Sequence, residues 1–217
     1  MRDHKPISLA DQVFERLEND ILTGKYQRGE LLTEIKLSES LGVSRTPIRE
    51  ALRRLEHEHI IEETSKGSLV LGITQDDLKD IYLIRQHTEG LAAYRAAQII
   101  TEEQLSELRE ILDLQEFYAN RGDAVHIKGT DHQFHELIYR YSGSNIIYNT
   151  LKPLHKKVQK YRQASVQNSE RALSSVKEHR DILNALEAHN AELAQKMMTQ
   201  HVINAYNSIA KSGEELK

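Results

Sequence analysis

Four residues in the second half of the chain have the types and the spacing of a divalent-metal site: Asp131, His135, His179 and His201. Asp131 and His135 are four residues apart, so they share one face of a helix. The other two histidines are each in phase with the apolar residues of their own segments. Three imidazoles and one carboxylate on facing helices favour zinc or nickel over magnesium, because imidazole suits the former ions and oxygen suits the latter.

The spacing around Asn190 supports the prediction of a metal site. The alternative is that each histidine is a hydrogen-bonded core residue, which is the more common role of a single inward histidine. Asn190 lies eleven residues after His179 and eleven residues before His201. If the chain reverses there into an antiparallel pair of helices, both imidazoles lie at one level, roughly 16 Å from the turn. Surface or capping roles are predicted for the other histidines, which are His4, His57, His59, His87, His126, His132, His155 and His189.

Arg85 is also predicted to face the interior of a helical bundle, because it is in phase with Ile81 and Ala92. A buried guanidinium needs an anion. The sequence leaves two candidates for that anion. One is Glu89, one helical turn further along the chain, and the other is a small carboxylate ligand held between Arg85 and the metal.

A second chemistry is carried by residues 42–56, GVSRTPIREALRRLE. Ser44 is a good N-cap, and Pro47 falls in the first helical turn, where its missing N–H does no harm. The apolar side of this helix consists of Ile48, Ala51, Leu52 and Leu55, and its polar stripe consists of Arg45, Thr46, Arg49 and Arg53. Such a helix suits the DNA major groove, because arginine binds guanine edges and phosphates. The alternative is an ordinary solvated helix.

The segments around the arginine helix predict a winged helix-turn-helix. They comprise a helix from Ser8 to Gly24, a turn at 26–30, a helix at 34–41, and strands at 60–64 and 68–71. The inner face of the first helix is predicted to consist of Leu9, Val13, Leu17 and Ile21. The two strands form a hairpin whose tip, with Lys66 and Gly67, can reach a phosphate or the minor groove.

Residues 8–72 resemble the DNA-binding domain of the GntR family of bacterial transcription regulators. The string LGVSRTPIREAL, at 41–52, carries the resemblance. The resemblance implies operator contacts by Arg45, Thr46, Arg49 and Gly67. Some members have an operator-contacting arginine where this chain has Ile35, so their operator sequences do not transfer to this chain.

From Gln75 onward the apolar residues follow a helical period throughout. Helices are predicted at 75–98, 102–121, 123–142, 144–164, 170–188 and 190–211. The chain is therefore predicted to be mostly α, with a winged helix-turn-helix domain at 1–73 followed by an all-helical antiparallel bundle at 74–217. Only Gly72 and Ile73 link the hairpin to the first bundle helix.

The second domain resembles the FCD effector domain, found in the branch of GntR regulators that includes the fatty-acid regulator. Many FCD domains bind zinc, nickel or a similar ion through one aspartate and three histidines, and the spacing from Asp131 to His201 fits that pattern. The resemblance implies that a small organic acid binds beside the metal. Arg85 is the residue predicted to hold it.

Composition excludes several classes of protein. The 217 residues include no cysteine, so disulfides and thiolate metal sites are excluded, and a cytoplasmic location is expected. No run approaches the roughly 20 apolar residues of a membrane span. The first 72 residues carry 11 Lys and Arg against 13 Asp and Glu, so any attraction to DNA must come from local clustering of charge.

The predicted function is that of a ligand-responsive transcription regulator, and this regulator is predicted to be a repressor. It is expected to act as a homodimer on a two-fold DNA operator. One alternative is a regulator in which the metal is itself the signal, and another is a helical metalloenzyme. Against an enzyme, no carboxylate is placed as a general base, and the single Glu-x-x-His motif, Glu56 to His59, lies outside the bundle.

Overall fold

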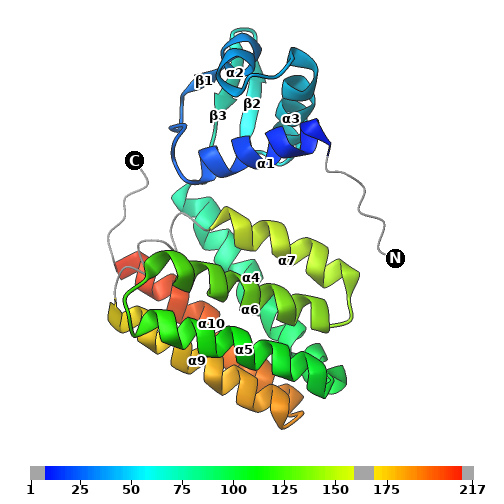
Figure 1. Ribbon diagram of the computed structural model, residues 1–217, viewed down its shortest axis with the longest axis vertical. Coiled ribbons are helices and arrows are strands. Elements are labelled where there is room, and N and C mark those ends of the chain that lie inside the picture. The colour runs from blue at the N-terminus through cyan, green and yellow to red at the C-terminus, as the bar shows by residue number, and fades with distance from the viewer. Residues whose placement is uncertain (1–7, 159–168, 212–217) are drawn as a thin grey trace. The chain divides into compact units, whose positions relative to one another are not determined.

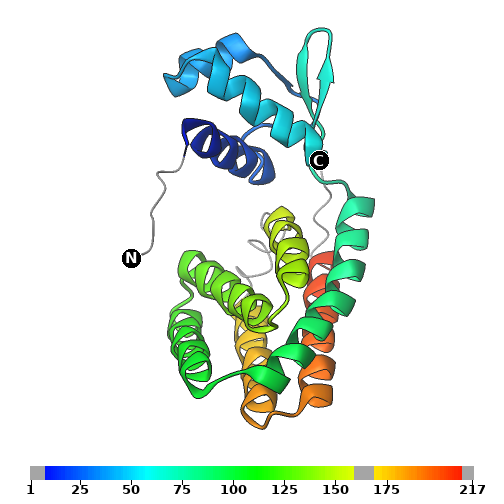
Figure 2. The same cartoon turned by 90° about the vertical axis from the view of Figure 1, so that its right-hand side faces the viewer.

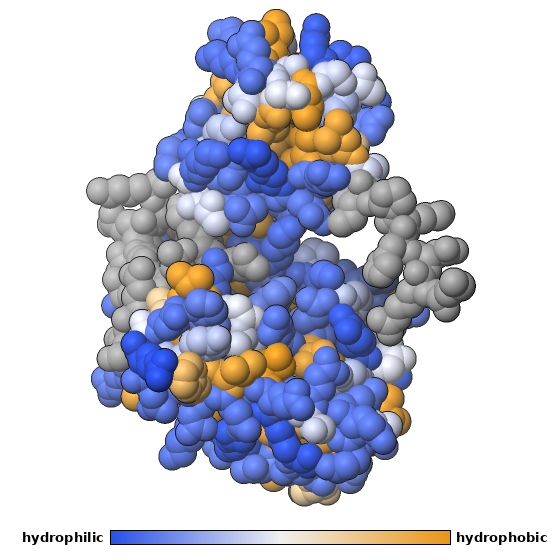
Figure 3. Space-filling view, in the orientation of Figure 1, coloured by the Kyte–Doolittle hydropathy of each residue, from blue (hydrophilic) through white to orange (hydrophobic). Residues whose placement is uncertain are grey.

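The computed structural model describes residues 8–158 and 169–211 of the chain. Its internal contacts divide these residues into two compact units, one ending at Thr74 and the other beginning at Gln75 (Figure 1). Helices dominate both units, and charged and polar residues cover most of the visible face (Figure 3). None of the helices in the described ranges combines the length and the apolar character needed to cross a bilayer.

The N-terminal unit is a winged helix-turn-helix, as predicted. Its elements are α1 (Leu9–Leu22), β1 (Leu31–Leu32), α2 (Glu34–Leu41), α3 (Arg45–His57), β2 (Ile61–Thr64) and β3 (Gly67–Val70). The three strands form an antiparallel sheet in the order β1-β3-β2. Strand β1 was not predicted, because two residues are too few to show an alternating pattern.

The apolar core of this unit explains one wrong prediction. Leu17, Ile48 and Leu55 are fully buried in it. Leu9 was expected on the inner face of α1 but is 49% exposed. The reason is that Leu9 lies in the first turn of α1, whereas the core residues of this helix begin only at Val13.

Gly67 is the residue on which the wing depends. It pairs with Thr64 as the first residue of β3, so the turn itself consists of Ser65 and Lys66 and is shorter than predicted. Its φ of +133° lies where side chains are rarely tolerated, and a Cβ there would lie 2.6 Å from the carbonyl oxygen of Leu32. Glycine therefore lets the hairpin approach β1.

The described part of the C-terminal unit is all-helical, as predicted. Within the described residues its helices are α4 (Gln75–Ile99), α5 (Glu102–Ala119), α6 (Ala124–Tyr141), α7 (Asn145–Lys157), α9 (Ser169–Glu187) and α10 (Ala191–Lys211). Thr101 and Gln104 form a capping box at the start of α5. The helix predicted at 144–164 is observed as α7 up to Lys157, and positions 159–164 lie outside the described residues.

Small residues bring α4 and α10 close together along their lengths (Figure 2). Four alanines of α4 are fully buried, namely Ala92, Ala93, Ala96 and Ala97. At Gly90 an added Cβ would overlap Thr199 Oγ1 and lie 3.3 Å from the backbone oxygen of Gln195. This close packing fixes the helix that carries His201 against the helix that carries Arg85.

Candidate metal centre and nucleic-acid interface

The structure brings the four predicted metal ligands together. Asp131 and His135 lie on α6, His179 on α9 and His201 on α10, and all four are buried. Their ligand atoms lie within 4.8 Å of one another. His201 Nε2 lies 3.2 Å from the Nε2 atoms of both His135 and His179, and Asp131 Oδ1 lies 3.8 Å from His179 Nε2.

The turn between α9 and α10 sets the register of two of these histidines. His189 has a left-handed φ of +49°, and the side chain of Asn190 accepts a hydrogen bond from the backbone N–H of Leu193 at 3.0 Å. The chain therefore reverses where the equal spacing predicted it would. As a result, His179 and His201 lie at the same level of the helix pair.

Each of the three imidazoles has an oxygen acceptor at its Nδ1 atom. The pairs are His135 with Glu89 (2.8 Å), His179 with Gln115 (2.8 Å) and His201 with Glu178 (2.6 Å). With Nδ1–H donating outward, each neutral ring turns the lone pair of its Nε2 inward. Three converging lone pairs repel one another unless a cation lies between them, so this donor set fits a divalent metal.

His155 was expected in a surface or capping role, and that prediction was wrong. It lies on α7 with 1% exposure; its Nδ1 is 2.9 Å from the hydroxyl of Tyr139, and its Nε2 is 4.0 Å from Asp131 Oδ2. Burial, together with the positive charge of Arg85, lowers the pKa of His155 well below its usual range. Its position four residues after the buried Leu151 was the sequence signal for this location.

Arg85 and Glu89 form a buried ion pair on α4, with 2.5 Å between Nε and Oε1 and 1% or less of each side chain exposed. The other oxygen of Glu89 accepts the Nδ1–H of His135, so one carboxylate joins the arginine to a candidate metal ligand. Burial opposes ionisation of Glu89, but the charge of Arg85 and the hydrogen bonds from His135 and Arg85 outweigh it and hold the pKa of Glu89 well below its usual range. Glu89 is thus the internal partner of Arg85.

Two buried polar atoms beside this ion pair have no hydrogen-bond partner within the described part of the chain. They are Nη1 of Arg85 and the hydroxyl of Tyr82. The guanidinium carbon of Arg85 lies 4.8 Å from the centre of the Tyr82 ring. Both atoms can donate, so each of them can bind an oxygen acceptor.

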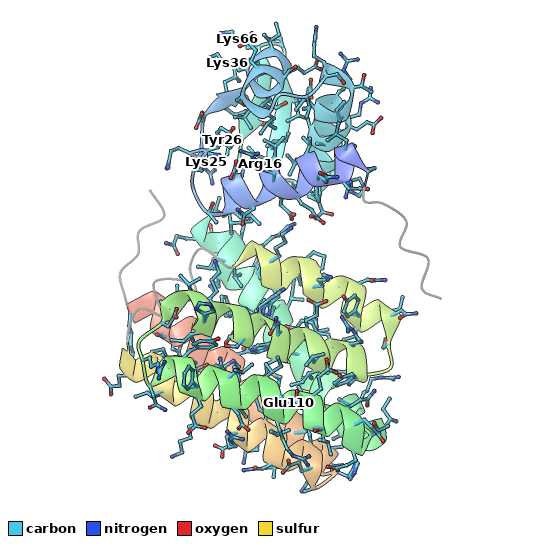
Figure 4. The ribbon with its side chains drawn as sticks, viewed as in Figure 1. Arg16, Lys25, Tyr26, Lys36, Lys66 and Glu110 are labelled. Carbon is cyan, nitrogen blue, oxygen red and sulfur yellow. The ribbon has the colours of Figure 1, made fainter. Side chains whose placement is uncertain are left out.

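The predicted DNA-contacting side chains lie on the surface of the N-terminal unit. Exposed residues include Ser44, Arg45, Thr46, Arg49, Arg53 and Lys66, whereas Gly67 is half-buried in the wing. Lys66 extends from the same end of the unit as Lys36 of α2 (Figure 4). Ser44 occupies the N-cap position of α3, but its side chain makes no capping hydrogen bond, contrary to expectation.

Arginines of α3 have two different environments. Arg45 and Arg49 both donate to the carboxylate of Glu34 at the start of α2, over distances of 2.7 to 3.0 Å. Arg54 stacks on Phe14, 3.9 Å from the ring centre, and pairs with Asp11. Arg54 therefore points away from the polar stripe.

Comparison with known proteins identifies both units. Residues 9–70 match the model for bacterial regulatory proteins of the gntR family, and residues 80–204 match the model for the FCD domain. The chain is 30% identical to the uncharacterized HTH-type transcriptional regulator YdhC of Bacillus subtilis, over 94% of this chain and 90% of that relative. The chain belongs to the GntR family.

Other relatives of this GntR-family chain agree with that assignment. It is 28% identical to the HTH-type transcriptional repressor RspR of Escherichia coli, again over 94% of this chain and 90% of the relative. The solved structure of E. coli McbR/YncC has the same fold, with a TM-score of 0.81, 23% identity, and coverage of 95% and 99% of the two chains. The GntR-family chain is therefore a ligand-responsive, DNA-binding transcription regulator and, as expected, not an enzyme.

Proposed function

We propose that the C-terminal unit binds one divalent ion, zinc or nickel, through Asp131, His135, His179 and His201, and that a small carboxylate effector binds beside it. The observation that carries this proposal is the convergence of three Nε2 atoms whose Nδ1 atoms are all held from behind. When bound, the ion would supply a Lewis-acidic centre with coordination positions for an effector oxygen.

Arg85 is the residue we assign to the effector. Its charge is balanced by Glu89, but its Nη1 and the hydroxyl of Tyr82 remain available for an acceptor. A hydroxy acid offers carboxylate and hydroxyl oxygens to both atoms. A relative named for a hydroxy acid supports this class of effector. The gluconate operon transcriptional repressor of Bacillus licheniformis is 34% identical to the chain, over 62% of this chain and 56% of that protein.

For the N-terminal unit we propose operator binding by the polar stripe of α3 and by the wing. The contacts would come from Ser44, Arg45, Thr46, Arg49, Arg53, Lys66 and Gly67. Residues 1–73 would form the DNA-binding domain, and residues 74–217 would form the effector domain. We also propose that the regulator is located in the cytoplasm, where operator DNA is found, and that it acts as a repressor.

We further propose that the regulator is a homodimer, because a two-fold operator needs two reading helices. An outward face of α4 carries three apolar side chains within nine residues, Leu83, Ile84 and Leu91, each more than two-fifths exposed. Exposed apolar groups on one helix face are typical of a protein–protein interface. Sedimentation of the full chain tests this part of the proposal.

The metal is tested by elemental analysis of protein purified without chelators. One zinc or nickel per chain is expected, together with its loss and a lower melting temperature in His179→Ala. The exposed residue His126, on α6, supplies the control His126→Ala, which should retain the metal. Absence of stoichiometric metal, with an unchanged melting temperature for His179→Ala, would contradict the proposal.

DNA contacts are tested by gel shift over a library of duplexes. Arg45→Ala or Arg49→Ala should weaken binding by roughly 1–3 kcal/mol if the side chain reads a base, and Lys66→Ala should reduce the salt dependence on every duplex. Arg121→Ala removes the same charge from the other unit and is the control. The same assay with metal alone, and then with organic acids, distinguishes a metal sensor from an effector-responsive regulator.

A further inference from the structure

Glu34 is the residue that connects the two arginines proposed to read DNA. It is the first residue of α2 and its side chain is 25% exposed. Arg45 donates from Nε (3.0 Å) and Nη2 (2.7 Å), and Arg49 donates from Nε (2.9 Å) and Nη2 (3.0 Å). One carboxylate thus accepts four hydrogen bonds from two recognition side chains.

Both guanidinium groups use the same edge for this contact. A guanidinium has five N–H donors in a rigid plane. With Nε and Nη2 directed to Glu34, the Nη1 end of each group makes no hydrogen bond to the described residues. Each arginine is therefore held in one orientation with its terminal edge available, and that edge can pair with the two acceptors of a guanine.

The carboxylate also changes the charge that DNA meets. Two arginines alone would present two positive charges, and phosphate attraction of this kind supplies most of the binding to nonspecific DNA. Glu34 cancels one of those charges and occupies two donors of each arginine. Its presence costs phosphate attraction at any sequence, but it leaves the base-reading edge in place.

We propose that Glu34 is a specificity-determining positioning residue, which fixes Arg45 and Arg49 for base readout and withholds them from the phosphates of nonspecific DNA. This proposal rests on the proposed role of the two arginines in operator binding. It requires that Glu34 act through the arginines rather than by touching a base.

The test compares full-length wild type with Glu34→Gln, which keeps the shape and removes the charge. One probe is a duplex that the wild type selects from a random-sequence library, and the other is a scrambled duplex of the same composition. Binding is measured from about 50 to about 200 mM salt, and Glu34→Gln should bind the scrambled duplex more tightly, with a salt slope steeper by about 0.9, equivalent to one more phosphate contact. The ratio of selected to scrambled affinity should fall about tenfold, since a tenfold change lies within the range expected when a bidentate contact to a base is lost.

Glu63→Gln is the matched control. Glu63 lines the same groove as Glu34 and Arg49 and is exposed, but it accepts no side-chain hydrogen bond from either arginine. Glu63→Gln removes the same charge as Glu34→Gln. If positioning of the arginines, and not net charge, determines specificity, the ratio of selected to scrambled affinity should stay within about twofold of wild type in Glu63→Gln. Equal effects of the two substitutions would overturn the proposal.

Nuclear magnetic resonance of the arginine side chains in the DNA-free protein tests the contact directly. The Nε–H signals of Arg45 and Arg49 should be protected from exchange in wild type and in Glu63→Gln, and exposed in Glu34→Gln. Unprotected wild-type signals would overturn the proposal. The proposal would also be overturned if the consensus selected by Glu34→Gln lacked one cytosine of the wild-type consensus but kept every guanine. That result would show that the carboxylate of Glu34 reads a base directly.

Variants of Arg45 and Arg49 distinguish this proposal from the proposal of operator binding on which it rests. If Arg45→Ala and Arg49→Ala both bind the selected duplex as wild type does, the assignment of the reading helix is wrong. If they lose binding while Glu34→Gln keeps the wild-type ratio, only the role of Glu34 is wrong.

Discussion

At the scale of single residues, Glu178 of α9 accepts hydrogen bonds from three side chains beside the candidate metal centre. It accepts from His201 Nδ1 at 2.6 Å, from both Nη atoms of Arg171 at 2.9 and 3.0 Å, and from Asn204 at 2.9 Å. A carboxylate held in this way fixes the tautomer of the imidazole and raises its basicity. The arginine that holds Glu178 thereby also orients His201.

Glu178→Gln is expected to weaken metal binding by about 10- to 100-fold, because an amide provides one acceptor where the carboxylate provides two. Competition with a chelator of known affinity measures the change. Glu170→Gln is the control, since Glu170 is an exposed carboxylate of the same helix. Equal metal affinity in Glu178→Gln and Glu170→Gln would show that Glu178 does not act on His201.

Glu34 gives a prediction about pH. Hydrogen bonds from Arg49, and then from Arg45, lower its pKa from 4.5 to about 2. A carboxyl whose pKa is lowered in the folded state contributes stability above its unfolded pKa and loses it as the pH falls. The contribution of Glu34 should therefore be intact above pH 4.5 and disappear as the pH falls toward about 2.

Carbon-detected titration of the Glu34 carboxyl measures this pKa in the folded protein. The midpoint should lie well below 4.5, the ordinary value for a glutamate. In an Arg45→Ala, Arg49→Ala double variant, the Glu34 midpoint should return to the ordinary glutamate range. A wild-type midpoint in that range would mean that the arginines do not hold Glu34 in solution.

Sequence spacing predicted the four candidate metal ligands, because residues at helical intervals share a face and an antiparallel turn places equal distances at one level. It did not predict the acceptors behind the imidazoles. Gln115, for example, lies on α5, 64 residues before His179, and no local pattern connects them. Contacts between helices depend on packing angles, which a sequence period does not specify.

At the scale of the elements, the crossing of α4 and α10 depends on Gly90. Alanine favours a helix interior over glycine by about 1 kcal/mol, so Gly90→Ala would stabilise an uncrowded helix. Here the added Cβ would overlap Thr199 Oγ1, whose hydroxyl donates to the carbonyl oxygen of Gln86 at 3.2 Å. We expect Gly90→Ala to destabilise the protein by about 1–3 kcal/mol, as overpacking does.

Denaturant unfolding of a double-mutant cycle checks this prediction. In a Thr199→Ala background the overlapping hydroxyl is gone, so most of the cost of Gly90→Ala should disappear. Gly129→Ala on α6 is the control, because nothing lies within 4 Å of its added Cβ, and it should stabilise. Equal stabilisation by Gly90→Ala and Gly129→Ala would show that the helices do not touch there.

The long helices were predictable because several turns of apolar period outweigh any single residue. The errors occurred where an element was short or a residue stood at its end. Strand β1 has two residues, and Leu9 stands in the first turn of α1. Tertiary contacts decide the fate of such positions, and local sequence carries little information about them.

At the scale of the whole molecule, effector and operator are expected to influence each other's binding reciprocally. Effector binding should change operator affinity by a coupling free energy of about 1–3 kcal/mol, and operator must then change effector affinity by the same factor. Calorimetry with a panel of hydroxy acids, with and without saturating selected duplex, measures both directions. The link between the units would pass through Gly72 and Ile73.

Arg85→Lys is the variant that identifies the route. Lysine preserves the charge opposite Glu89 but has no Nη1, so effector affinity should fall while the fold remains. Glu110→Gln, a change at the surface of α5, is the control. An acid that binds without altering operator affinity, or that binds Arg85→Lys as tightly as wild type, would exclude this mechanism even if the metal is present.

Glu89 has a consequence for how such a regulator can evolve. One carboxylate serves both the effector arginine and a candidate metal ligand, so the two cannot be changed independently. Replacing Glu89 by an apolar residue would strand a buried cation, a change that costs about 3–5 kcal/mol, and would release His135 in the same step. Related regulators with a different effector are therefore expected to keep this carboxylate and to differ in the residues around the effector. Related regulators that no longer bind the metal are expected to lack both Arg85 and Glu89.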